Sequence, residues 1–297
     1  MISILDTKDR CNNKLSIVKN AYTCKDSKFI NCQNAGDSSC VLTISFSELK
    51  NHVECSYRHK LQYIDKINMF EENVNTNFGT ALHESCEHYL KSREMKYELA
   101  LDYIVEAWKK YDLPDLGQWL KEANAILEAV PKFLDERFPG WKYVSAEEKI
   151  HERIEGKHSQ EVAFKGYIDG IIEHDGIFYI LDWKTSSKGW NKYKKEDETL
   201  KMQLVLYAKF WGQKHNIEAS KIRVGFVVLN RDLSNPERIE FFTFPIEEKA
   251  TKNTLKILNN AISMKRDGLY FKQWKYKVPN QQRNCRFCDY NETKYCP

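Results

Sequence analysis

The chain has 297 residues, of which 42% are hydrophobic and 30% charged, and it carries a formal net charge of +4. These proportions are ordinary for a globular protein, and no apolar stretch is long enough to span a bilayer, so we expect no membrane association. The amino terminus lacks a secretory signal pattern, and we therefore expect a cytoplasmic, intracellular protein.

Residues 1–43 are polar and show no sustained periodicity, so we expect a weakly structured extension or a few short strands. This segment contains four widely spaced cysteines without a C-x-x-C pair, and we favour unliganded thiols over a second metal site: Cys11, Cys24, Cys32 and Cys40. The remainder, residues 44–297, is predicted to form a single domain.

Helical patterns dominate residues 44–138. Ser45 and Glu48 fit a capping box that opens a helix to about Ile64, which would place Cys55 in the middle of that helix. Three more helices are predicted, over residues 79–92, 97–111 and 115–137.

Strand patterns follow the Pro-Gly turn at 139–140. The predicted sheet core, residues 139–246, has strands over 142–154, 162–173, 177–183, 222–230 and 238–244, with a helix over 199–215 after a lysine-rich loop. A last helix over 247–266 and a cysteine-containing tail complete the part 247–297. Helices and strands together form an α/β pattern without a flexible linker, which predicts that the helical half and the sheet half pack as one domain.

The central segment KGYIDGIIEHDGIFYILDWKT is typical of a β-hairpin, because Asp175-Gly176 favours a tight turn between two apolar runs. Asp182 and Lys184 point to the same face, since side chains alternate along a strand, and pairing brings Asp169 beside them. Burying these charges is costly unless they pair or bind a cation, so the cluster is a candidate site.

Two aspartates can hold a divalent cation, and a neighbouring lysine can orient water or stabilise developing negative charge. Phosphodiester hydrolysis has these requirements. An isolated D-x-K triplet is weak evidence, and a solvated ion pair is the alternative.

The order helix, three strands, helix, strand, with GYIDGI and LDWKT on the second and third strands, resembles the core of the PD-(D/E)XK nuclease superfamily. Within it the chain is most similar to the RecB nuclease domain and the CRISPR-associated RecB-like exonucleases. The resemblance implies a restriction-endonuclease-like core, a central mixed sheet flanked by helices behind a helical N-terminal half.

Two further motifs carry the resemblance. Gln203 and Tyr207 resemble the family's Q-x-x-x-Y motif, and Gly79 and His83 its G-x-x-x-H motif. By resemblance, Mg²⁺ or Mn²⁺ is bound by His83, Asp169 and Asp182, Lys184 positions or activates water, and Gln203 and Tyr207 support Lys184 and contact DNA.

Nine cysteines are many for a reducing compartment. Cys285 and Cys288 form a C-x-x-C pair, and Cys296 follows; with Cys55 they resemble the iron-sulfur staple of CRISPR-associated and AddB-type nucleases. The resemblance implies a four-iron four-sulfur cluster, and zinc remains the alternative, because sequence does not separate the two. One departure is Ser56, where the family often has proline after the first cysteine.

The lysine-rich loop after the hairpin contains Lys188, Trp190 and Lys192. Lysines neutralise phosphates and aromatic rings stack on bases, which suits single-stranded DNA or duplex ends. A solvated loop with a packing aromatic is an equal alternative.

Together these features predict a metal-dependent deoxyribonuclease, an exonuclease or DNA-end-processing enzyme. The alternative is a DNA-end-binding iron-sulfur scaffold subunit of a repair, recombination or CRISPR complex. A helicase, integrase or recombination protein would then be its partner. No Walker-type glycine loop is present, so we expect no ATP-driven motor in this chain.

Overall fold

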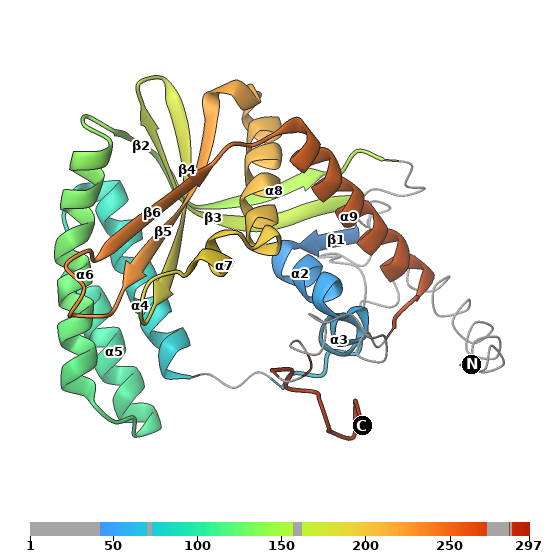
Figure 1. The fold of residues 1–297 in the computed structure, drawn as a ribbon, viewed down its shortest axis with the longest axis horizontal. Coiled ribbons are helices and arrows are strands. Elements are labelled where there is room, and N and C mark those ends of the chain that lie inside the picture. The colour runs from blue at the N-terminus through green and yellow to red at the C-terminus, as the bar shows by residue number, and fades with distance from the viewer. Residues whose placement is uncertain (1–41, 70–72, 157–161, 272–284, 286) are drawn as a thin grey trace, which may run out of the picture. The chain divides into compact units, whose positions relative to one another are not determined.

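The computed structural model describes residues 42–69, 73–156, 162–271, 285 and 287–297 (Figure 1). Residues 1–41 of the predicted extension, with its four cysteines, lie outside these residues, whereas its last two residues begin a strand. The chain divides into two compact units: unit 1 comprises 1–70, 151–165 and 252–297, and unit 2 comprises 71–150 and 166–251. None of the helices among the described residues combines the length and apolarity that a membrane span requires.

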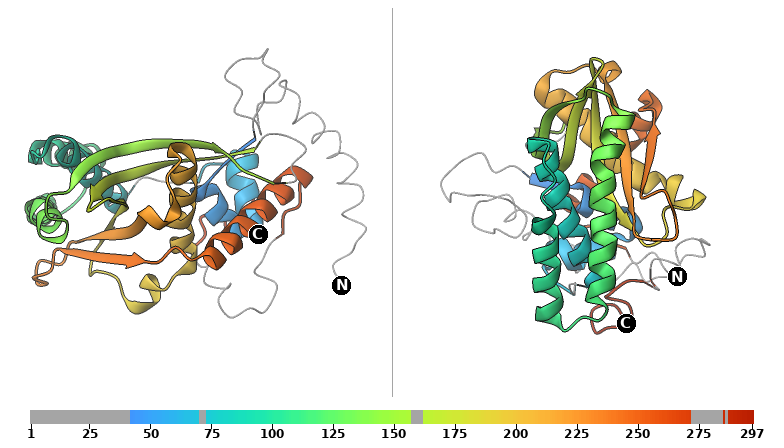
Figure 2. Two further views of the ribbon diagram at one scale, coloured as in Figure 1. Left: turned by 90° about the horizontal axis from the view of Figure 1, so that it is seen from above. Right: turned by 90° about the vertical axis from the view of Figure 1, so that its left-hand side faces the viewer.

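Three helices of unit 2 pack on one another: α4 (Val74–Ser92), α5 (Tyr97–Tyr111) and α6 (Leu116–Arg137). Figure 2 shows α5 and α6 side by side. Helix α4 begins earlier than predicted because the Asn73 side chain accepts hydrogen bonds from the amides of Asn75 and Thr76. The apolar faces of α4, α5 and α6 pack together and form a core that contains Phe78, Leu82 and Trp108.

Four strands of the sheet are consecutive neighbours: β3 (Val162–His174), β4 (Ile177–Ser186), β5 (Ile222–Asn230) and β6 (Ile239–Phe244). The β3–β4 and β5–β6 pairs are antiparallel, whereas β4 and β5 are parallel. Strand β2 (Lys142–Arg153) also pairs with β3. The sheet is therefore mixed, as predicted.

Helices cover both faces of this sheet in unit 2. Leu181, Trp183 and Val227 belong to the core that α4, α5 and α6 share. Helix α8 (Glu198–His215) packs on β4 and β5, and β5 is buried along nearly its whole length, which requires cover on both faces. The loop predicted before α8 contains a short helix, α7 (Lys192–Lys195), and a 3₁₀ turn, η2 (Ala219–Lys221), precedes β5.

Unit 1 contains β1 (Leu42–Ser45), α2 (Phe46–Glu54), α3 (Ser56–His59), a π-helical turn η1 (Lys60–Ile64) and most of α9 (Glu248–Asp267). Strand β1 pairs in parallel with the first residues of β3. The predicted continuous helix is wrong, because Cys55 adopts an extended backbone, with φ −165° and ψ 110°, and separates α2 from α3. Cys55 therefore lies at a break between helices.

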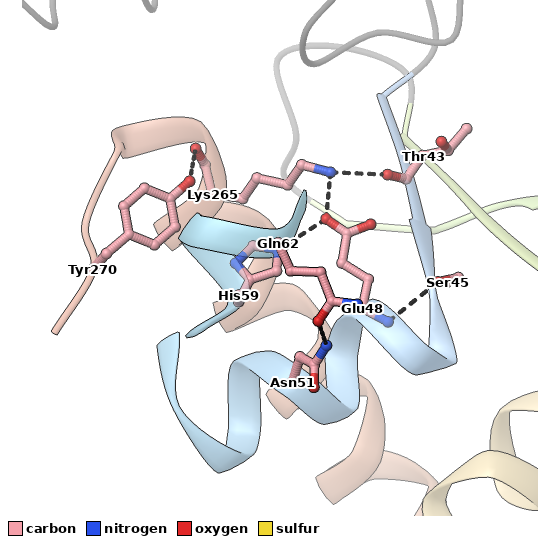
Figure 3. A network of polar contacts seen from close by, with 8 residues as sticks. All are labelled: Thr43, Ser45, Glu48, Asn51, His59, Gln62, Lys265 and Tyr270. Carbon is pink, nitrogen blue, oxygen red and sulfur yellow. Dashed lines mark hydrogen bonds and ion pairs between the residues drawn. The ribbon is translucent and has the colours of Figure 1, made fainter. Parts of the chain in front are cut away.

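A buried polar network joins the elements of unit 1 (Figure 3). Ser45 caps α2 as predicted, accepting from the Glu48 amide at 3.2 Å. The Glu48 side chain does not complete a capping box; its Oε1 lies 2.6 Å from Lys265 Nζ and 2.8 Å from His59 Nε2. Lys265 Nζ also donates to the Thr43 carbonyl oxygen at 3.2 Å. The network ties α9 to β1, α2 and α3.

Candidate active site

The predicted hairpin is present in unit 2 as β3 and β4. Asp175 and Gly176 both have positive φ, 51° and 75°, as the tight turn between twisted antiparallel strands requires. The strands pair from His174–Ile177 to Gly170–Leu181. This register carries the two aspartates and the lysine to the same end of the hairpin.

Asp169 stands directly beyond the last pair of that ladder. Its Oδ2 accepts a hydrogen bond of 2.9 Å from the backbone amide of Trp183 on β4. A side chain thus replaces the carbonyl that would otherwise continue the ladder. The exchange fixes the Asp169 carboxylate beside β4.

Asp182 is almost completely buried, at 1% exposure, and lies on the face of β4 that α8 covers. Its Oδ1 accepts a hydrogen bond of 2.8 Å from Gln203 Nε2. Its Oδ2 lies 2.5 Å from Lys184 Nζ but has no hydrogen bond of acceptable geometry. This buried carboxylate oxygen is therefore held by its ion pair with Lys184 and not by a well-aligned hydrogen bond.

The electrostatics of the cluster show a shortage of positive charge. Burial raises the pKa of Asp182 to about 6, and the neighbouring Asp169 adds to the rise while Lys184 opposes it. Burial likewise raises the pKa of Asp169 to about 6. For Lys184, burial alone would lower the pKa, but Asp182 and Asp169 outweigh it and raise the pKa. A single lysine does not compensate two buried acids.

His83 lies on α4, with Nδ1 3.7 Å from Asp169 Oδ2. Burial, with the positive Lys184, lowers the pKa of His83 to about 4, so the imidazole is neutral at neutral pH and can act as a ligand. Gly79, one turn earlier, faces Thr185 of β4, and a Cβ there would lie 3.4 Å from Thr185 Oγ1. A residue larger than alanine would therefore hinder this approach of α4 to β4.

Gln203 and Tyr207 share one face of α8, as their spacing predicts. Gln203 Nε2 donates to Tyr207 Oη at 3.3 Å as well as to Asp182. Tyr207 lies against β3 at Gly166, where a Cβ would come within 2.9 Å of the ring. Gln203, with Tyr207 beside it, therefore supports the Asp182 side chain from α8.

Sequence reasoning missed three contributors to this site. Gly166 provides the room for Tyr207. Glu87, one turn after His83, and Glu147, at φ 49° within β2, both raise the pKa of Asp169. The spacing of four between His83 and Glu87 was an available signal, whereas the turn of the backbone at Glu147 had none.

The donor set suits a hard cation, since it offers two carboxylates, one of them with an oxygen lacking a hydrogen bond, and a neutral imidazole. As the side chains stand, no three His, Cys, Asp or Glu residues among those described converge closely enough to hold a metal ion. Lys184 Nζ instead lies against the Asp182 oxygen that a cation would need.

The four predicted cluster cysteines all belong to unit 1. Burial raises the pKa of the Cys285 thiol, and Cys55, Cys288 and Cys296 raise it further, so these three cysteines lie in the neighbourhood of Cys285. Tight turns shape the tail, with the Cys288 amide donating to the Cys285 carbonyl at 3.1 Å. Four thiols suit iron-sulfur or zinc chemically, although they do not converge to coordination distance as they stand. Cys86, by contrast, is buried in the helical core of unit 2.

The loop proposed to contact DNA differs from its expectation at one residue. Trp190 is only 5% exposed and packs between Phe226 and Phe242, with ring centroids 5.0 Å and 6.1 Å away. The packing alternative therefore applies to Trp190, because a buried ring does not stack on a base. Lys188 and Lys192 are exposed and remain candidates for phosphate contacts.

Known proteins are similar to this chain in sequence or in fold. The chain matches the model of the PD-(D/E)XK nuclease superfamily over residues 43–297. A protein from Eubacterium rectale described as a candidate exonuclease has a similar fold, with 12% identity, a TM-score of 0.52, and coverage of 90% of this chain and 92% of that one. The crystal structure of SSO0001 aligns over 93% of both chains at 14% identity with a TM-score of 0.40. No curated protein sequence matches significantly. The match over most of the chain, on strands that bring an aspartate and a D-x-K motif together, makes this protein a member of the PD-(D/E)XK nuclease superfamily.

Proposed function

We propose that the protein is a metal-dependent deoxyribonuclease that acts on single-stranded DNA or duplex ends, as an exonuclease or end-processing enzyme. The observation that carries the proposal is the charge of the buried cluster. Two carboxylates share one lysine, and an oxygen of Asp182 has no hydrogen bond. Family membership supports phosphodiester cleavage as the chemistry.

In this proposal His83, Asp169 and Asp182 hold Mg²⁺ or Mn²⁺. The bound cation supplies charge stabilisation for the phosphorus centre under attack and lowers the pKa of water. Asp169 stays fixed because the Trp183 amide holds one of its oxygens. Asp182 keeps its orientation through Gln203.

Lys184 has the remaining role. Its side chain is 30% exposed, and its ammonium lies against the buried Asp182 carboxylate at the end of the hairpin. With Asp182 serving as a ligand, the Lys184 ammonium would be available to orient the attacking water or to stabilise a phosphate oxygen. The raised pKa of Lys184 keeps it charged at neutral pH, which favours orientation of water and charge stabilisation over proton abstraction.

The test is cleavage of end-labelled single-stranded and duplex DNA with Mg²⁺, with Mn²⁺ and with chelator. Parallel substrates with blocked termini or closed circles separate exonuclease from endonuclease action. Asp182→Ala should abolish cleavage while DNA binding and folding persist. Equal cutting by this variant under matched metal would refute the assignment, and binding by wild type without metal-dependent cutting would favour the scaffold alternative.

For unit 1 we propose that Cys55, Cys285, Cys288 and Cys296 hold a four-iron four-sulfur cluster that ties the tail to the first helices. The raised pKa of the Cys285 thiol beside Cys55, Cys288 and Cys296 supports this assignment. Anaerobically purified protein should absorb in the visible range. A colourless sample with stoichiometric zinc would instead establish the zinc alternative.

A further inference from the structure

The C-terminal tail is attached to the α3 region by side chains other than its cysteines. Ser56 Oγ donates to the Phe271 carbonyl at 3.1 Å and accepts from the Phe271 amide at 2.8 Å. One hydroxyl thus satisfies both backbone groups of a residue more than two hundred positions away. Ser56 is 2% exposed, so water competes little for these bonds.

Two tyrosines make comparable attachments farther along the tail. Tyr57 Oη donates to the Tyr295 carbonyl at 3.2 Å, next to Cys296. Tyr290 Oη, between Cys288 and Cys296, donates to the Ile67 carbonyl at 2.6 Å, and Tyr290 is 2% exposed. Each bond runs to backbone, so it fixes the course of the chain and not merely a side chain.

The attachments flank the thiols on both sides. Cys55 immediately precedes Ser56, and its Sγ lies 4.0 Å from the same Phe271 carbonyl that Ser56 binds. The network of Glu48, His59 and Lys265 connects α2, α3 and α9 (Figure 3). Tyr270, next to Phe271, donates from its Oη to the Lys265 carbonyl at 3.3 Å. The start of the tail is therefore anchored by the two Ser56 bonds and the Tyr270 bond, beside the long Cys55 contact.

We infer that Ser56, Tyr57 and Tyr290 form a metal-independent clasp that preorganises the four-cysteine site. Metal enters folded protein, and its loss leaves the tail docked. The thiol-binding step rests on the proposed cysteine site, whereas the docking step does not.

Hydrogen exchange of the full chain, anaerobic and reduced, tests docking in protein stripped of metal by a chelator. In wild type the amides of Phe271 and Cys296 should exchange at least about tenfold more slowly than in an unstructured peptide. Exchange of both at unstructured rates would overturn the clasp.

Ser56→Ala removes both hydrogen bonds and should abolish the protection of the Phe271 amide in metal-free protein, while α2 amides are unchanged. Ser263→Ala is the matched control, because that hydroxyl bonds within α9. Metal-free Ser56→Ala protein with wild-type protection would also overturn the inference. If this buried variant does not fold, Tyr57→Phe decides, since it removes one tail bond from a half-buried residue and should speed exchange of the last residues alone.

Zinc titration of reduced protein, against a chromophoric chelator, gives the second readout. Preorganisation predicts that Ser56→Ala weakens zinc binding about 30-fold, from two lost hydrogen bonds of about 1 kcal/mol each, and that Ser56→Thr restores part of the affinity. Unchanged affinity in Ser56→Ala would reject preorganisation. Absence of zinc binding by wild type would reject the cysteine site itself, while the exchange data still decide docking.

Discussion

Both units contain a buried carboxylate beside a lysine, yet the two pairs behave in opposite ways. In unit 1, Glu48 Oε1 and Lys265 Nζ are 2.6 Å apart, and in unit 2, Asp182 Oδ2 and Lys184 Nζ are 2.5 Å apart. Burial alone would raise the pKa of Glu48, but Lys265 and His59 outweigh it and lower the pKa to about 2. The pKa of Asp182 is raised to about 6.

The difference lies in how many partners each charge has. Lys265 binds both Glu48 and the Thr43 carbonyl, and Glu48 has His59 as well, so the unit 1 pair is compensated. In unit 2, Asp169 adds a second negative charge, and among the described residues Lys184 is the lysine that offsets both acids. The compensated pair of unit 1 is a structural connection, whereas the shortage of positive charge in unit 2 suits the cation that we propose there.

The largest contrast is expected from neutralising each acid. Asp182→Asn keeps the acceptor for Gln203 but removes the ligand charge, and should lower metal-dependent cleavage by roughly a thousandfold or more. Its thermal stability without metal should be equal to wild type or higher, because a costly buried charge is gone. Single-turnover cleavage and a thermal melt measure the two effects. A large loss of stability would show that Asp182 is structural after all.

Glu48→Gln should have the reverse effect. It leaves Lys265 buried without a counter-ion, which costs about 3–5 kcal/mol, while cleavage per folded molecule is retained. Urea unfolding followed by circular dichroism measures the cost. The double variant with Lys265→Met should recover much of it, and failure to do so would mean that the pair contributes more than mutual compensation.

The pH dependence of the two pairs should have opposite signs. Metal-free Asp169 and Asp182 have pKa values of about 6, above the ordinary 3.8, so their neutral forms favour folding below pH 3.8 and this contribution is lost as pH rises through 6. Glu48, with its pKa lowered from 4.5 to about 2, stabilises unit 1 above pH 4.5, and that stability is lost as pH falls towards 2.

Cation binding requires the ionised acids, so Mg²⁺ affinity and cleavage should fall steeply as pH decreases below 6. Calorimetric Mg²⁺ titrations at pH 5 and pH 7.5 test this expectation. An Mg²⁺ affinity that is the same at pH 5 and pH 7.5 would contradict the raised pKa values of Asp169 and Asp182.

Removing the support that Gln203 and Tyr207 give to Asp182 should reduce cleavage to an intermediate extent. Gln203→Ala leaves Asp182 Oδ1 without its 2.8 Å donor and should reduce activity by about 10- to 100-fold, as loss of the partner of a metal ligand typically does. Tyr207→Phe removes the long 3.3 Å contact from Gln203, while the 2.8 Å bond of Gln203 to Asp182 stays, and should cost less than about tenfold. Cleavage rates at saturating metal compare the two, and the reverse ranking would count against Gln203 as the main support.

The smallest effect is expected in the lysine-rich loop. Lys188→Ala and Lys192→Ala should each weaken DNA binding slightly and reduce the salt dependence by about one counter-ion. Lys201→Ala, on α8 and paired with Glu198, is a control. DNA titrations at several salt concentrations give the slope of affinity against salt. Slopes equal to that of wild type in both variants would show that the loop does not contact phosphates.

The sequence predicted the elements of unit 2 well because their patterns are local. The helix over 97–111 and the strand over 222–230 have the predicted limits. The register of the hairpin followed from Asp175-Gly176 and strand alternation. The convergence of Asp169, Asp182 and Lys184 was therefore predictable, and resemblance added His83, Gln203 and Tyr207.

What the sequence did not reveal depends on contacts between distant segments. The break at Cys55 follows no helix-breaking residue, and Glu48 left its capping role for a lysine 217 positions away. Trp190 was ambiguous until Phe226 and Phe242 enclosed it. Contacts between segments that are distant in the sequence decide these features, and local conformational propensity does not.

The hydrogen bond from the Trp183 amide to Asp169 limits how this enzyme can evolve. A carboxylate on a single methylene reaches the neighbouring strand's amide, whereas the longer glutamate would carry its oxygens past it. Conservative exchange of the two acids should therefore be tolerated unequally among descendants of this sequence: Asp182 can drift to glutamate, the family's other option, while Asp169 is constrained by the backbone it completes.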